Sequence, residues 1–351
     1  MKFVHIADMH FDMPFTLLSQ NGLAEDRRLD QRNAFRKMIN YIKENNIEYL
    51  LIAGDLYENE YVRKSTIDYI NDCFKEIPNT KIYITPGNHD PYLNNSYYNK
   101  YDWNENVCIF TDLDKVENEN ANIYGYGFTN FYSKKVKLPT NLDNSKINIL
   151  IMHSDLDGSS KQYGDYNPIL KSEFNNTSFD YIALGHIHKK KFANNEKIIY
   201  PGSTISGGFD ELGHHGMIVG NIDEKTKKIS LEFIQLDNKE FIETNLDISD
   251  INSKEELIEN INELKIDNDK YYKIILTGNR NIEINTNQLL KHIENNNIIK
   301  LKDKTKVEYD LEKISREQSL KGIFVKELLN QINEENKEEI LESIYIGLNI
   351  M

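Results

Sequence analysis

The sequence lacks the features of an exported or membrane-embedded protein. Its 351 residues include two cysteines, Cys73 and Cys108, so at most one disulfide could form, and buried free thiols are the expected state of both. No apolar run approaches the roughly 18 residues that a membrane span needs. The opening residues, MKFVHIADMH, begin a strand pattern at once and contain no signal-peptide pattern. We therefore expect a cytoplasmic protein with no membrane partner.

The sequence also lacks the excess of positive charge that is typical of proteins with polyanionic partners. The formal net charge is −14, and neither half is basic: residues 1–220 hold 23 Lys and Arg against 29 Asp and Glu, and residues 221–351 hold 19 against 27. Dense basic runs are confined to residues 134–137 and 189–191, and such runs are by default solvated loops. Any contact with nucleic acid would therefore depend on bound cations, local clusters or a partner protein.

The first half of the chain alternates between short apolar runs and amphipathic stretches. Strands alternating with helices are typical of βαβ units and of a largely parallel or mixed sheet covered on both faces. The length allows two domains, and the fold class that we predict is α/β. Strand patterns occupy residues 3–7, 49–53, 81–85, 147–152 and 180–184, and helix patterns occupy residues 28–46 and 62–77.

Polar residues capable of binding metal follow five of these strands at the point where each strand ends. One such segment, ITPGNHDP, would by itself be an ordinary turn, but the repetition at five strands makes that interpretation improbable. The carboxyl ends of the strands in an open α/β sheet form one edge, and ligand sites are built there. The residues concerned are Asp8 and His10, Asp55, Asn88 and His89, His153, and His186 and His188.

The donor atoms of these residues restrict the chemistry. Carboxylate, amide and imidazole groups without a thiolate suit Mn²⁺, Fe²⁺, Zn²⁺ or Co²⁺ better than the oxygen-only preference of Mg²⁺ or Ca²⁺. Without His89 the set contains seven candidate ligands, which are too many for one tetrahedral ion and suffice for two ions if one carboxylate bridges them. Two ions about 3.5–4 Å apart are a recurring device for phosphoryl transfer, in which they activate water and hold the attacking and leaving oxygens.

The order Asp-x-His, Gly-Asp, Gly-Asn-His-Asp, His and Gly-His-x-His resembles the motifs of the calcineurin-like metallophosphoesterase superfamily, over residues 1 to about 220. The resemblance implies a sheet sandwich covered by helices and two divalent ions per chain, with Mn²⁺ as the expected metal. It also implies the distribution of the ligands: one ion on Asp8, His10 and His188, the other on Asn88, His153 and His186, with Asp55 bridging both.

The same resemblance assigns catalytic roles to two residues that do not bind metal. His89 would face the phosphate and either stabilise the transition state or protonate the leaving alkoxide. Glu58 stands where related phosphoesterases often keep an acidic partner for that histidine, and its carboxylate would hold the imidazole in its charged or donor form. Asp90 is expected to bond the backbone of its own turn.

Within the superfamily, the downstream segments YNPI, FDYIALGHIHKKK and IIYPGSTISGGFDELGHHG resemble the SbcD-type DNA repair nucleases, as does the opening HIADMHFDMPF. The arginine that protein serine/threonine phosphatases carry after the second motif is absent from GDLYENE. The resemblance implies DNA as substrate, an SMC-like ATPase of the SbcC type as partner, and a possible homodimer. Relatives from archaea and eukaryotes often carry histidine at the position of Glu58, so details tied to that residue do not transfer.

The second half of the chain is expected to form a small module. We predict a phosphoesterase domain over residues 1–222 and an α+β capping, DNA-positioning and partner-binding domain over residues 223–351. Strands are expected at 227–236, 240–248, 271–278 and 305–314, and helices at 253–265, 286–296, 320–332 and 338–350, with Ser253 as a helix cap. The last two helices either pack on the capping domain or keep an apolar face for a partner helix.

The sequence therefore predicts a metal-dependent phosphodiesterase, most specifically an SbcD-type DNA exonuclease or endonuclease. Two alternatives stay open at this point. One is a phosphodiesterase or phosphatase that acts on small nucleotides or other phosphoesters. The other is a non-catalytic scaffold that binds DNA or an ATPase, against which the complete ligand set argues.

Overall fold

The chain divides into two compact units. The computed structural model describes residues 1–19, 22–158, 166–192 and 196–351. The first unit comprises Met1–Ile242 with Asn268–Tyr271, and the second comprises Glu243–Asp267 with Tyr272–Met351.

The first unit extends past the predicted boundary at residue 222. The reason is a hairpin: β11 (Ile229–Gln235) pairs antiparallel with β10 (Gly216–Ile222), so both strands belong to one sheet. The functional division into residues 1–222 and 223–351 stays a prediction.

The first sheet of this unit has six strands in the order β11-β10-β1-β2-β3-β4. The four strands β1, β2, β3 and β4 are parallel, and β10 is antiparallel to β1. The parallel strands are β1 (Lys2–Ile6), β2 (Tyr49–Ala53), β3 (Lys81–Thr85) and β4 (Val107–Ile109).

The second sheet has five strands in the order β5-β6-β7-β8-β9, of which β6, β7, β8 and β9 are parallel. Its strands are β5 (Asp114–Glu117), β6 (Ala121–Tyr126), β7 (Ile147–His153), β8 (Tyr181–Gly185) and β9 (Ile198–Ile199). The α/β sheet sandwich predicted from the sequence is thereby confirmed.

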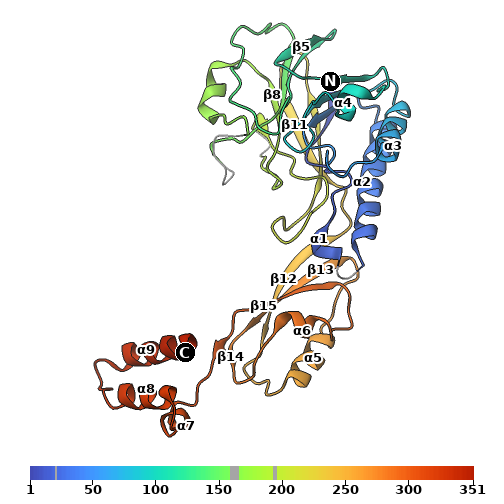
Figure 1. Cartoon of the computed structure of the whole chain (residues 1–351). Coiled ribbons are helices and arrows are strands. Elements are labelled where there is room, and N and C mark those ends of the chain that lie inside the picture. Colours follow the sequence, from blue (N-terminus) through green and yellow to red (C-terminus); the bar gives the residue numbers. More distant parts are fainter. Residues whose placement is uncertain (20–21, 159–165, 193–195) are drawn as a thin grey trace. The chain divides into compact units, whose positions relative to one another are not determined.

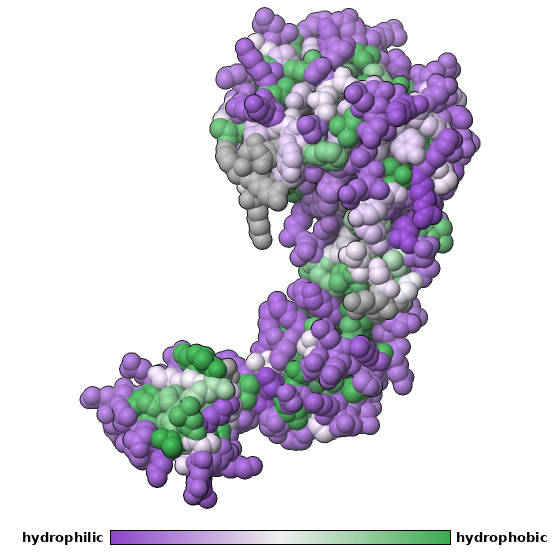
Figure 2. Space-filling view, viewed as in Figure 1, coloured by the Kyte–Doolittle hydropathy of each residue, from purple (hydrophilic) through white to green (hydrophobic). Residues whose placement is uncertain are grey.

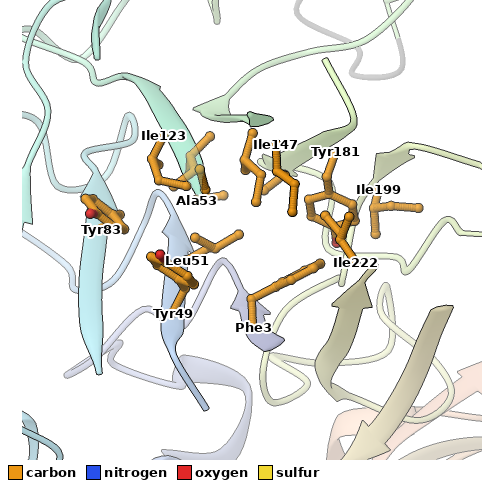
Figure 3. Packing of buried hydrophobic residues seen from close by; sticks show 14 of the residues in the cluster. Phe3, Tyr49, Leu51, Ala53, Tyr83, Ile123, Ile147, Tyr181, Ile199 and Ile222 are labelled. Atoms are coloured by element: carbon orange, nitrogen blue, oxygen red, sulfur yellow. The ribbon is translucent and has the colours of Figure 1, made fainter. Parts of the chain in front are cut away.

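An apolar core holds the two sheets together (Figure 3). Phe3 and Leu51 of the first sheet face Ile123, Ile147 and Tyr181 of the second, and all five side chains are buried. Burying one large apolar side chain stabilises a fold by about 1.5–3 kcal/mol relative to exposing it. This core fixes the two sheets against each other and therefore also fixes the ends of their strands.

Helices cover the outer face of the first sheet (Figure 1). All five residues of β2 are buried. Because side chains alternate along a strand, Leu50 and Ile52 point away from the core that contains Leu51. On that side lie α2 (Ala24–Glu44) and α3 (Lys64–Lys75), whose Phe35 and Phe74 rings are 5.9 Å apart.

Where the structure describes the connections of the first unit, they contain three short helices, and none of these carries a ligand candidate. They are α1 (Thr16–Ser19), α4 (Tyr97–Lys100) and the 3₁₀-helix η1 (Lys171–Asn176).

The second unit contains a small α+β module with its own core. Its three-stranded sheet has the order β12-β13-β15, and the side chain of Ser253 caps α5, as predicted, by accepting a hydrogen bond from the backbone N–H of Glu256. The elements are β12 (Glu240–Asp247), α5 (Lys254–Asn262), β13 (Lys270–Thr277), β14 (Asn279–Arg280), α6 (Thr286–Leu290), β15 (Ile298–Asp303) and β16 (Lys306–Val307). The first residues of β12 and β13 belong to the first unit.

The strand predicted over residues 305–314 is wrong for most of its length. Strand β16 covers only Lys306–Val307, and α7 begins at Leu311. The side chain of Asp310 accepts a hydrogen bond from the backbone N–H of Lys313 and so caps that helix. The alternation of apolar and polar residues before this cap was the signal that resembled a strand.

Three helices end the chain: α7 (Leu311–Ser315), α8 (Leu320–Leu329) and α9 (Lys337–Ile350). They share a cluster in which Val325, Ile344 and Leu348 are buried. Among the described residues, no helix has the length and apolar character to cross a bilayer. Both cysteines are free thiols, with Cys73 buried and Cys108 half-buried.

His5 in β1 makes the stability of the first unit depend on pH. Its imidazole is completely buried, and Nδ1 lies 3.0 Å from the Tyr181 hydroxyl. Burial lowers the pKa of His5 from 6.5 to about 3 because the charged form loses its water. His5 therefore binds a proton more readily in the unfolded chain than in the folded chain. Its contribution to the free energy of unfolding is at its full value above pH 6.5 and decreases as the pH falls towards 3.

We expect His5→Gln to remove this dependence, because glutamine keeps a polar group near Tyr181 but does not titrate. Between pH 7 and pH 5 the free energy of unfolding should fall by up to about 2 kcal/mol more in the wild type than in the variant. Urea unfolding with EDTA present measures this difference. His292→Gln, which removes an exposed imidazole, should follow the wild type; identical pH dependence in all three proteins would contradict the assignment.

Candidate metal centre

The predicted ligands lie at the carboxyl ends of strands from both sheets. Asp8 and His10 follow β1, Asp55 follows β2 and Asn88 follows β3, all in the first sheet. His153 ends β7, and His186 and His188 follow β8, both strands of the second sheet. The single sheet edge expected from the sequence is therefore wrong: the ends of two packed sheets converge. These ends place Asp8, His10, Asp55, Asn88, His153 and His188 close together, and their use as ligands stays a prediction.

The backbone is strained at four of these positions. Asp8 (φ 50°), His10 (φ 49°), Asp55 (φ 52°) and His186 (φ 100°) have the positive φ that residues other than glycine rarely adopt. Each such residue costs about 1–3 kcal/mol and persists only where its surroundings fix it. Four strained residues among seven candidate ligands indicate that the loops are shaped for the site.

Two glycines give the ligands room. A Cβ atom at Gly54 would lie 2.2 Å from Nδ1 of His153, and one at Gly87 would lie 2.3 Å from a carboxylate oxygen of Asp55. Both distances are far below van der Waals contact. The glycine before Asp55 and the glycine of the PGN turn thus allow His153 and Asp55 to approach the neighbouring backbone.

The first group of ligands joins Asp8, His10 and His188, whose ligand atoms all lie within 4.8 Å of one another. Nδ1 of His10 donates to Glu58 at 2.8 Å, and Nδ1 of His188 donates to Glu211 at 2.6 Å. The two Nε2 atoms then face each other at 3.2 Å. Burial would lower the pKa of His188, but its hydrogen bond to Glu211 raises it to about 10, so a cation would bind here in exchange for a proton. An imidazole whose remaining proton lies on Nδ1 presents a lone pair at Nε2, and this pair then fits a shared cation.

The second group centres on Asp55 and His153. The Nδ1–H of His153 donates to the carbonyl of Ala53 at 3.0 Å, which leaves Nε2 2.9 Å from Oδ1 of Asn88 and 3.2 Å from Oδ2 of Asp55. Asp8, Asp55 and His153 form another set with ligand atoms within 4.8 Å. An imidazole nitrogen, an amide oxygen and a carboxylate oxygen directed at one point also fit a divalent cation.

His186 is less closely placed. Its ring lies beside that of His153, with centroids 5.1 Å apart, and its backbone N–H donates to Asp8. In the described part of the chain its imidazole does not join a set of three acidic, cysteine or histidine side chains within 4.8 Å. Burial lowers the pKa of His186 to about 4, so the ring is neutral and able to act as a ligand.

Asp55 lies between the two groups. Burial alone would raise its pKa, but His153 and His10 hold it well below 3.8, so the carboxylate is ionised. Its Oδ2 is 3.2 Å from Nε2 of His153 and 3.8 Å from Nε2 of His10. This position suits the bridging role, which stays a prediction.

His89 lies beside the ligand groups and is 46% exposed, whereas Glu58 is 12% exposed. One oxygen of Glu58 accepts from His10, and the other accepts from Nδ1 of His89 at 2.9 Å. Burial would lower the pKa of His89, but the hydrogen bond that it donates to Glu58 raises it to about 9. The hydrogen bonds from His10 and His89 in turn outweigh the burial of Glu58 and lower its pKa to about 2. The structure contains the predicted His89–Glu58 contact; its catalytic use stays a prediction.

Asp90 ties the loops after β2 and β3 together. Its carboxylate accepts from the backbone N–H groups of Gly87, Asp55 and Leu56, and from the hydroxyl of Tyr98. The predicted hydrogen bond to the backbone of its own turn is present. The hydrogen bonds to the loop after β2 were not predicted.

Glu211 was not among the residues predicted from the sequence. Its carboxylate orients His188 and also accepts hydrogen bonds from the Ser203 hydroxyl and the Gly207 N–H. These bonds outweigh the effect of burial and lower its pKa to about 2. A carboxylate that holds the outer nitrogen of a ligating histidine is a common support of metal sites. The sequence feature that could have indicated this role is an acidic residue in the glycine-rich segment that follows His188.

Comparison with known proteins points to one family. Residues 1–190 match the calcineurin-like phosphoesterases. The chain is 27% identical over 278 residues to the SbcD component of the nuclease SbcCD from Staphylococcus epidermidis (strain ATCC 12228 / FDA PCI 1200), an alignment that covers 69% of each protein. It is 26% identical over 254 residues to the uncharacterized metallophosphoesterase YhaO of Bacillus subtilis (strain 168). That alignment covers 66% of this chain and 60% of YhaO, so the chain spans less than two thirds of YhaO.

The geometry predicts about two Mn²⁺ ions per chain after loading at neutral pH. Asp55→Asn should lower the content below one, because a carboxylate situated between both groups contributes charge to each. Elemental analysis of desalted protein measures the content. Asp72→Asn, an equivalent change on the exposed surface of α3, is the matched control. One ion or none in the wild type, or full occupancy in Asp55→Asn, would contradict the two-ion centre.

Proposed function

The chain belongs to the calcineurin-like phosphoesterase family, a family of metal-dependent phosphoesterases, and we propose that it hydrolyses phosphodiester bonds in DNA as an SbcD-type nuclease. The family supports phosphoester hydrolysis. The choice of DNA is supported by the downstream motifs that resemble SbcD-type nucleases and by the similarity to a protein named as part of a nuclease.

In this proposal the seven candidate ligands hold two divalent ions, with Mn²⁺ favoured by their mixture of carboxylate, amide and imidazole donors. When bound, such ions act as Lewis acids on the phosphoryl group and activate water. The chain's own contribution is to orient the ligands. Glu58, Glu211 and the Ala53 carbonyl each fix the Nδ1 proton of one histidine, so that Nε2 is presented to the ion.

The observation that carries the proposed mechanism is the state of His89. Its imidazole is half exposed beside the ligand groups, and Glu58 accepts the Nδ1 proton. With a pKa of about 9, the ring is an imidazolium at neutral pH. Nε2 is then the remaining donor, and it can stabilise negative charge on the phosphate or protonate the leaving oxygen.

We expect the protein to degrade end-labelled DNA in the presence of Mn²⁺. His89→Ala should keep the metal content of the wild type and bind DNA nearly as well, because His89 is not among the proposed ligands. Its cleavage rate should fall about 10²–10⁴-fold, the range for loss of a general acid or transition-state donor. Gel analysis of duplex and single-stranded DNA, together with elemental analysis, measures both quantities.

A small generic phosphodiester and the variant His292→Ala serve as controls for this experiment. His292 is exposed in the second unit, and its loss should leave cleavage unchanged. Hydrolysis of the small diester with DNA left intact would favour the small-substrate alternative. Loss of metal from His89→Ala would mean that His89 is a ligand.

We further propose that the C-terminal helices bind an ATPase of the SbcC type. Apolar residues gather on these helices (Figure 2), and several of them are exposed. On α8, Leu320 is 74% and Ile323 59% exposed, and on α9, Ile346 is 55% and Ile350 81% exposed. The shared cluster of α7, α8 and α9 leaves these side chains available for helix-in-groove recognition.

Replacing both Ile323 and Ile346 by Glu should abolish co-purification with a co-expressed SbcC-type ATPase, since two charges would have to be buried at the interface. Hydrolysis of a small diester should not change, because neither residue belongs to the metal centre. Leu170→Glu, a charge introduced at a 46% exposed leucine in the first unit, is the control. Unchanged affinity of the double variant would place the interface elsewhere.

A further inference from the structure

A cavity of about 530 Å³ in the first unit is lined in part by residues that closely follow His10 and Glu58 in the chain. Its walls come from the loop after β1, from the first turns of α2, and from the connection between β2 and the start of α3. Most of its charged lining is arginine, and it also includes an exposed tyrosine ring. The residues that matter here are Asp12, Glu25, Arg28, Arg32, Tyr61 and Arg63.

Arginine is scarce in this acidic chain and is concentrated at this cavity. The chain has seven arginines, and three of them line the cavity. The other four are engaged by carboxylates: Arg27 by Asp237, Arg36 by Glu76, Arg280 by Asp303 and Arg316 by Glu312.

Arg63 differs from all of these. It is exposed, and within the described ranges its guanidinium has no carboxylate at salt-bridge distance. Its five N–H donors suit bidentate contact with a phosphate. A guanidinium without a carboxylate partner at the wall of a cavity is therefore available to a ligand.

Arg28 and Arg32 also line the cavity, and each is paired with a carboxylate but remains partly exposed to solvent. Arg28 pairs with Glu25 at 2.8 Å, but Glu25 is 87% exposed, so solvent screens that pair. Arg32 donates to Asp12 at 3.3 Å and to the Thr66 hydroxyl at 3.0 Å. Three guanidinium groups thus face two carboxylates, which leaves a local positive charge in a chain of net charge −14.

Asp12 connects the two sides of the cavity. Besides Arg32, its carboxylate accepts from the backbone N–H of Arg63 at 3.1 Å and from the hydroxyl of Thr66 at 2.6 Å. Its φ of 65° is another strained value. The carboxylate therefore fixes the arginine-bearing elements relative to each other. Its negative charge is partly neutralised by the donors that it accepts from.

The cavity and the metal centre share the same two segments. Asp12 follows His10 by two residues, and an extended chain covers at most about 7 Å in two residues. Tyr61 follows Glu58 by three residues and donates its N–H to the Glu58 carbonyl at 3.0 Å. Phe11 and Tyr57 join the segments through a short parallel bridge. A polymer whose phosphate lies at the metal centre can therefore reach the cavity with another phosphate of the same strand.

We propose that this cavity binds a second backbone phosphate of the strand whose scissile phosphate lies at the metal centre, and that it thereby makes the enzyme prefer a polynucleotide to a single phosphodiester. Arg28, Arg32 and Arg63 hold the phosphate, and the 50% exposed ring of Tyr61 offers a face on which a base stacks. The inference rests on the proposed function and specifies where an acidic protein holds the DNA strand.

Binding of a short fluorescein-labelled oligothymidylate, measured by fluorescence anisotropy with EDTA, tests the inference. Arg63→Gln should bind about five- to tenfold more weakly than the wild type. The slope of log affinity against log salt should decrease in magnitude by about 0.7, the contribution of one phosphate contact on a single strand. Arg28→Gln should shift both quantities in the same direction. Lys43→Gln removes an exposed charge from the same helix, α2, and should match the wild type.

Cleavage with Mn²⁺ separates this inference from the proposed function. The loss of kcat/KM in Arg63→Gln should be at least about fivefold greater for the oligothymidylate than for a small diester, in proportion to the lost binding. A wild type that cleaves the oligothymidylate, with Arg63→Gln indistinguishable from Lys43→Gln, overturns the inference alone. A wild type that hydrolyses only the small diester overturns both. Displacement of the probe by inorganic phosphate as effectively as by unlabelled oligothymidylate also overturns the inference.

Discussion

The buried carboxylate of Asp55 is the group around which the first unit is arranged. It is 2% exposed, and it stays ionised because His153 and His10 lie within 4 Å of it. A charge in this position would be very costly without partners. The backbone N–H of His89 donates to it, and Asp90 holds the backbone N–H of Asp55 itself. The imidazoles and backbone N–H groups near Asp55 thus offset the free-energy cost of burying its charge.

The sheet sandwich makes this arrangement possible. Apolar side chains between the sheets fix the strand ends of both, and the ligands occupy the first residues beyond those ends. The loops then adopt left-handed backbone at several ligands and place Gly54 and Gly87 where any side chain would collide. Strain of this kind lowers stability locally and is offset by the packed core beneath it. A side chain at either glycine would therefore displace a ligand of the metal centre.

The sequence revealed much of this architecture because strand and ligand signals are local. Strands at Lys2–Ile6, Tyr49–Ala53 and Lys81–Thr85 alternate with amphipathic helices, and each is followed by its polar residues within five positions. The division of the strands between two sheets was not predictable from periodicity, since pairing partners are set by tertiary packing. The role of Glu211 was hidden for the same reason, because it reaches His188 from 23 residues away. The strand prediction for residues 305–314 was wrong because apolar and polar residues alternate there before the helix cap at Asp310.

Whether two ions bind at the converging strand ends can be read from the anomalous diffraction of crystals grown with Mn²⁺. We expect two anomalous peaks, one between Nε2 of His10 and Nε2 of His188 and the other beside Nε2 of His153 and Oδ1 of Asn88. An oxygen of Asp55 should lie within bonding distance of both. A single peak, or peaks that do not contact Asp55, would rule out a two-ion centre bridged by this carboxylate.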